Sequence, residues 1–201
     1  MRMGQHKDDL HRYLRSGRAS LLWKLEGLSE YDLRRPLVPT GTNLLGLVKH
    51  LASVEGGYFG ETFDRPMDEP LLANLDFDAD PNADLWATAD ESRDDIVALY
   101  RRVWDHADAT IGQLDLDAVG RVPWWPEGRD EVTLHLILVH VATETHRHAG
   151  HADIVRELID GTAGLREGGD NLAYHDAGQW STYHDRLDEL ARRFVDEPGE
   201  G

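Results

Sequence analysis

Residues 140–151 are the part of the chain whose side chains are best suited to chemistry. Four potential metal ligands recur there in a run of helical periodicity, namely His140, Glu144, His148 and His151. An α-helix advances about 100° per residue, so these four side chains fall within about 80° of one another on the helix surface. Imidazole and carboxylate groups are unfavourable in a protein interior unless they are paired or bind a cation. The stretch therefore predicts a metal site.

This helix face should point toward the core. It also carries three apolar residues, Ile137, Val155 and Leu158. Glu144 and His148 are four residues apart and lie one turn above each other, so one ion can touch both. The pairs His148 with His151 and His140 with Glu144 are alternatives that the spacing leaves open. Because one helix rarely supplies a complete set of ligands, another helix should contribute one.

His50 is the candidate for that further ligand. It lies in a helix predicted for residues 43–63, and three neighbours on its face are apolar or aromatic, namely Leu47, Val54 and Tyr58. His50 should therefore also point inward. Glu61 returns to nearly the same direction three turns later, where it could face the mouth of a site.

The other elements define an all-α protein. Helical periodicity also covers residues 6–28, residues from about 84 or 90 to 114, and residues 131–159, and a short amphipathic pattern covers 181–194. The crossovers between these helices are long and contain proline and glycine, and no strand alternation of useful length is present. We predict a four-helix bundle with a short appended C-terminal helix, forming one domain over residues 1–201 with its core at about 6–160 and a tail at 161–201.

Trp124 and Trp125 form an aromatic pair between two prolines, just before the histidine-rich helix. One interpretation is that they pack over the end of the bundle. The other is that they line a ligand pocket.

Composition excludes several functions. The net charge of −17 argues against nucleic-acid binding, and the absence of cysteine excludes disulfides, thiolate metal sites and a cysteine nucleophile. No apolar run is long enough to span a membrane, and the N-terminus lacks the apolar segment of a signal peptide, so we expect a cytoplasmic protein. The excess of arginine over lysine is typical of a GC-rich bacterial genome.

The pattern of His50 with Glu144 and His148 resembles that of the DinB-like superfamily, whose four-helix bundles hold a metal in their interior. The resemblance extends from the first helix to Asp160. Members most often carry a His-x-x-x-His pair on the fourth helix, whereas the first position here is Glu144. The mycothiol-dependent maleylpyruvate isomerase branch is similar, with a His, Glu, His set, and the sequence phrases around His50 and Glu144 resemble an actinobacterial branch.

The resemblance implies activity with a low-molecular-weight thiol. The ligand set suits a divalent metal, with Zn²⁺ favoured over Ni²⁺, Fe²⁺ or Mn²⁺. We therefore expect a metal-dependent S-transferase or isomerase whose small-molecule partners are a thiol such as mycothiol and an electrophile. Five residues are expected to support the ligands or contact substrate, namely Tyr58, Trp124, Trp125, His140 and His151. The alternatives are a non-catalytic bundle in which the ion is structural or a ligand is sensed, and, less favoured, a metal-dependent hydrolase. Because such bundles often pair, a homodimer is left open.

Overall fold

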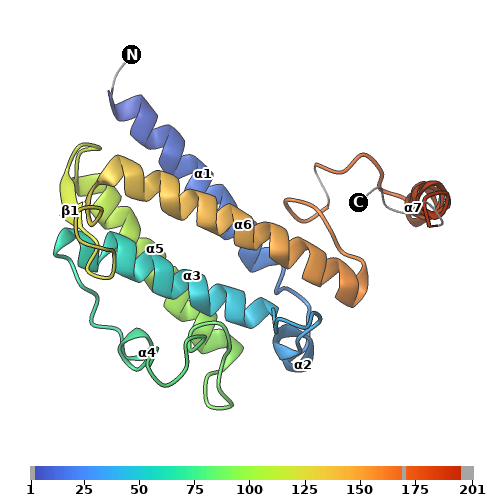
Figure 1. Ribbon diagram of the computed structural model, residues 1–201, viewed down its shortest axis with the longest axis horizontal. Coiled ribbons are helices and arrows are strands. Elements are labelled where there is room, and N and C mark those ends of the chain that lie inside the picture. Colours follow the sequence, from blue (N-terminus) through green and yellow to red (C-terminus); the bar gives the residue numbers. More distant parts are fainter. Residues whose placement is uncertain (1–2, 169–170, 196–201) are drawn as a thin grey trace. The chain divides into compact units, whose positions relative to one another are not determined.

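Four long helices form the body of the structure, a computed structural model that describes residues 3–168 and 171–195. These helices are α1 (Met3–Trp23), α3 (Leu44–Phe59), α5 (Arg93–Gln113) and α6 (Leu134–Asp160). Helix α1 packs against α6, and α3 packs against both α5 and α6 (Figure 1). The prediction of an all-α bundle with long crossovers is therefore confirmed. Within the described residues, no helix is long and apolar enough to cross a membrane.

Local capping sets the ends of the two helices that carry the candidate site. The side chains of Asn43 and Thr133 accept hydrogen bonds from backbone amides in the first turns of α3 and α6. Helix α6 ends at Gly161, whose φ of 76° is a left-handed conformation that glycine adopts without strain. Helix α3 ends four residues earlier than predicted, because Gly60 turns the chain into the 3-10 helix η1 (Glu61–Phe63).

The crossovers contain short elements that hydropathy patterns do not indicate. They are α2 (Glu30–Arg34), α4 (Pro70–Ala73), β1 (Val119–Arg121) and β2 (Glu131–Thr133). The two strands pair antiparallel, with Gly120 opposite Val132. Three residues are too few to produce a recognisable alternation. Because β2 takes the first three residues of the predicted helix, α6 begins at residue 134.

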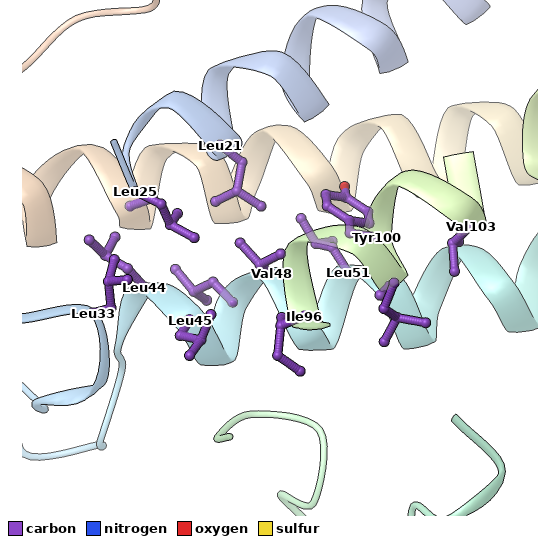
Figure 2. Close-up of a cluster of buried hydrophobic side chains, with 14 of the residues drawn as sticks. Leu21, Leu25, Leu33, Leu44, Leu45, Val48, Leu51, Ile96, Tyr100 and Val103 are labelled. Carbon is purple, nitrogen blue, oxygen red and sulfur yellow. The ribbon is translucent and has the colours of Figure 1, made fainter. Parts of the chain in front are cut away.

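Two clusters of buried apolar side chains hold the long helices together. Figure 2 shows the first cluster, where leucines of α1 and α3 meet Ile96, Tyr100 and Val103 of α5. The second cluster gathers around Phe59, with Ile111 from α5 and Ile137 from α6. Full burial of one such side chain contributes about 1.5–3 kcal/mol. These clusters fix α3 and α6 as neighbours along their length.

Leu158, which was expected to face the core, is instead 60% exposed. Helix α6 has 27 residues and α3 has 16. The last turns of α6 extend past the start of α3 (Figure 1). Leu158 belongs to the last turn of α6. Ile137 and Val155, on the same side of α6, are buried as expected.

Residues from Gly164 onward form a second compact unit. Its helix α7 (Ala177–Arg192) starts four residues before the predicted position, because the Asp176 side chain caps it. Three aromatic rings pack against one another near its start, namely Tyr174, Trp180 and Tyr183. The predicted C-terminal helix is therefore present, whereas a single domain over residues 1–201 stays a prediction.

Candidate metal centre

His50 of α3 meets Glu144 and His148 of α6 between the two helices. One ligand-type atom of each residue lies within 4.8 Å of the other two. The Oε1 atom of Glu144 is 3.6 Å from Nε2 of His50 and 2.9 Å from Nε2 of His148. The two imidazole rings meet edge to face, with their centroids 4.8 Å apart. The fold thus brings together the three residues predicted as ligands.

These three side chains are shielded without being sealed from solvent. The exposed fractions of their side chains are 19% for His50, 28% for Glu144 and 11% for His148. Partial burial strengthens electrostatic interactions at the site. The remaining exposure leaves a path by which a small molecule can reach it.

Asp84 is a partner of His50 that the sequence analysis missed. Its Oδ2 atom lies 2.8 Å from Nδ1 of His50, and Asp84 is buried. With the Nδ1 hydrogen donated to this carboxylate, Nε2 keeps its lone pair and faces Glu144. Carboxylates commonly orient metal-ligating histidines in this way. No spacing rule could have found Asp84, because it lies in a crossover 34 residues after His50.

The electrostatics of the site favour an ionised carboxylate beside a neutral imidazole. Burial opposes charge on His50, but the hydrogen bond to Asp84 and the negative charges of Asp84 and Glu144 raise its pKa above the ordinary value. Burial also opposes ionisation of Glu144, yet the hydrogen bond from His148 and the electrostatic attraction of the two histidines hold its pKa below the ordinary value. Burial and the adjacent charge of His50 lower the pKa of His148. Ionised Glu144 and neutral His148 are the forms that ligate metals.

The chemistry of these groups fits a divalent cation. Two imidazole nitrogens and a carboxylate oxygen are common ligands of Zn²⁺ and of several other first-row metals. Three protein ligands leave coordination positions for water or substrate, as in reactive rather than structural zinc sites.

His151 contacts a member of this group without belonging to the group itself. Its Nδ1 atom lies 3.3 Å from Nδ1 of His148, and the residue is exposed. The structure therefore places His151 beside the ring edge of His148 that faces away from Glu144, whose contact is with Nε2. A role as an outer partner of His148 agrees with this position.

Tyr58 organises an aromatic group next to the three residues. Its hydroxyl accepts a hydrogen bond of 3.1 Å from Nε1 of Trp125. The ring of His140 packs edge to face against both Tyr58 and Trp125, with centroids 4.8 and 5.5 Å apart. Trp125 joins the second apolar cluster. For Trp125, the packing interpretation is therefore the one that the structure supports.

Trp124 occupies a different environment. It is 49% exposed, its ring contacts Tyr58, and it lines a cavity of about 680 Å³ beside α3. Glu61 also lines this cavity, although it follows the end of α3 and lies in η1, so the helical spacing from His50 does not extend to it. The pocket interpretation therefore applies to Trp124.

The helical bundle and the His, Glu, His group on two facing helices agree with the DinB-like class, to which the family match below assigns the chain. The sequence matches the Mycothiol-S-transferase family over residues 9–161, and this chain belongs to that family. No curated protein gives a significant match to the sequence.

Proposed function

We propose that the protein is a metal-dependent thiol S-transferase in which His50, Glu144 and His148 bind a divalent cation, with Zn²⁺ as the first candidate. The observation that carries the proposal is the convergence of three ligand-type atoms in a chain of the Mycothiol-S-transferase family. Mycothiol is the proposed thiol, and the second substrate is a small electrophile.

The chain's own residues prepare the site for this reaction. Asp84 orients His50, and ionised Glu144 supplies the negative charge that balances a cation. A bound divalent cation lowers the pKa of a coordinating thiol, so that the thiolate is available at neutral pH. The sulfur forms a bond to the electrophilic carbon, the leaving group departs with the bonding electron pair, and the thiol proton passes to solvent. Because the chain contains no cysteine, the thiol must come from a separate molecule.

The test combines metal analysis with a transfer assay on protein made without a histidine tag. We expect about one divalent cation per chain and mycothiol-dependent consumption of a fluorogenic electrophile. His50→Ala, Glu144→Gln and His148→Ala should each lose metal and activity. His135→Ala, which changes an exposed histidine at the start of α6, should lose neither. Full activity in metal-free His50→Ala protein would refute the proposal.

We expect the proposed activity to operate in the cytoplasm, where low-molecular-weight thiols stay reduced. A homodimer and an actinobacterial source stay predictions from the sequence.

A further inference from the structure

The cavity beside α3 has the size and walls of a small-molecule site. Its volume of about 680 Å³ lies within the usual range for such sites, roughly 300–1,000 Å³. The walls come from α3, η1 and α4, from the segment that carries Met67, and from the two loops that carry Phe77 and Trp124. Side chains far apart in the sequence therefore enclose one space.

Two consecutive glycines of α3 make room for the walls. A Cβ atom on Gly57 would lie 2.8 Å from Cη2 of Trp124, and one on Gly56 would lie 2.9 Å from Cδ1 of Leu72. Glycine inside a helix is unfavourable by about 0.5–1 kcal/mol relative to alanine. The helix thus carries two unfavourable residues at the positions where Leu72 and Trp124 approach it.

The cavity and the candidate metal centre share one face of α3. Val54 and Tyr58 line the cavity, and they lie one and two turns beyond His50 on the same face of α3. Tyr58 also contacts His140, which is one turn before Glu144 on α6. One turn spans about 5.4 Å. Val54 and Tyr58 therefore connect a wall of the cavity with the face of α3 that carries His50.

The chemistry of the walls restricts the ligand. Leucine, methionine, phenylalanine, tyrosine and tryptophan side chains dominate them, and Glu61 is the only charged residue among the described residues that line the cavity. Aromatic faces favour apolar rings and cations. The carboxylate of Glu61 and the net charge of −17 disfavour anions.

From these features we infer that the cavity binds the electrophile, and that the electrophile is an apolar aromatic compound that is neutral or positively charged. The identity of this ligand as the electrophile rests on the proposed transferase function. The existence of the binding site is independent of that function, because the cavity is formed by side chains that need neither a metal nor a thiol. In this inference, Trp124 packs against the aromatic ring of the ligand. The carboxylate of Glu61 favours a positively charged ligand over an anion.

The test uses three unreactive naphthalene probes that carry a trimethylammonium, a methyl or a carboxylate group, with binding measured by calorimetry on the full chain. The cationic probe should bind about threefold to fivefold tighter than the anionic one, because the exposed carboxylate of Glu61 attracts the first and repels the second through solvent. Glu61→Gln should remove this preference and leave the neutral probe unchanged. Glu157→Gln, an exposed carboxylate of α6, is the matched control.

Two further variants separate the cavity from general folding. Trp124→Ala should weaken all three probes, whereas Trp86→Ala, which removes a similarly exposed tryptophan outside the cavity, should not. Gly57→Ala should keep or raise Tm, because alanine favours the helix, yet weaken the probes by displacing Trp124. Probe binding that is insensitive to both Trp124→Ala and Gly57→Ala would overturn the inference, even if thiol transfer is observed. Glu61-dependent binding without any thiol transfer would support the cavity and refute the transferase.

Discussion

The carboxylate of Asp84 lies 2.8 Å from Nδ1 of His50, although 34 positions separate the two residues in the chain. The contact directs the opposite nitrogen of the ring toward Glu144, which lies on another helix. A residue of a proline-containing crossover thereby positions a side chain inside the bundle.

Replacing Asp84 should weaken metal binding without removing a ligand. We expect Asp84→Asn to raise the Kd for the cation about 10–100-fold, the usual effect of losing an outer partner of a ligating histidine. Competition with a chromophoric chelator measures this Kd. Asp78→Asn, an exposed change in the same crossover, should leave it unaltered. Equal affinities for the Asp84→Asn and wild-type proteins would show that this contact does not support a metal ligand.

Removal of the cation should lower Tm while the helices persist. A cation at 100 times its Kd stabilises the native state by about 2.7 kcal/mol, which corresponds to roughly 5–10 °C for a domain of this size. The two apolar clusters hold the helices together without it. Thermal melts with and without a chelator measure the shift, and His148→Ala should show none. Loss of helical circular dichroism on chelation would instead favour the structural-ion alternative.

A cluster of charged side chains around Asp108 links α5 to α1. Its ion pairs should determine how the free energy of unfolding changes at acidic pH. Asp108 contacts His11, Arg15 and Arg18 of α1. Burial opposes its ionisation, but hydrogen bonds from His11 and Arg18 hold the pKa of Asp108 far below its ordinary value of 3.8. A carboxylate with a depressed native pKa stabilises the fold above its ordinary pKa, and this contribution is lost as the pH falls further.

Asp108→Asn should therefore destabilise the protein by about 1–3 kcal/mol at pH 7. The difference from wild type should shrink below about pH 4, where the unfolded wild-type chain takes up the proton first. Urea unfolding at several pH values measures both effects. Asp105→Asn, an exposed change on the same helix, is the control. A difference that stays constant from pH 7 to pH 3 would contradict the assigned cause.

The convergence of His50, Glu144 and His148 could be predicted because it depends on local geometry. The 100° step of a helix fixes which side chains share a face, and neighbouring apolar residues indicate which face is buried. The same rule failed for Leu158, because periodicity does not reveal where the partner helix begins. The length of α3 decides that outcome.

The paths of the crossovers could not be predicted in the same way. The contact of Asp84 with His50, the separation of Trp124 from Trp125 and the pairing of β1 with β2 all depend on how loops return to the bundle. The hydropathy pattern of a loop does not indicate where the loop passes over the bundle. The sequence contains Gly56 and Gly57, but it does not indicate that Leu72 and Trp124 pack closely against these two glycines.

His151 provides a last test of how many residues ligate the cation. Its exposed ring meets Nδ1 of His148 at 3.3 Å, a long contact for a hydrogen bond. We expect His151→Ala to raise the metal Kd by about tenfold at most, within the effect of an outer partner. The absorption spectrum of the Co²⁺-loaded protein should stay unchanged in His151→Ala, because the coordination number is the same, whereas His148→Ala, which lacks a ligand, should not develop this spectrum when Co²⁺ is added. A spectral change in His151→Ala would instead identify His151 as a fourth ligand.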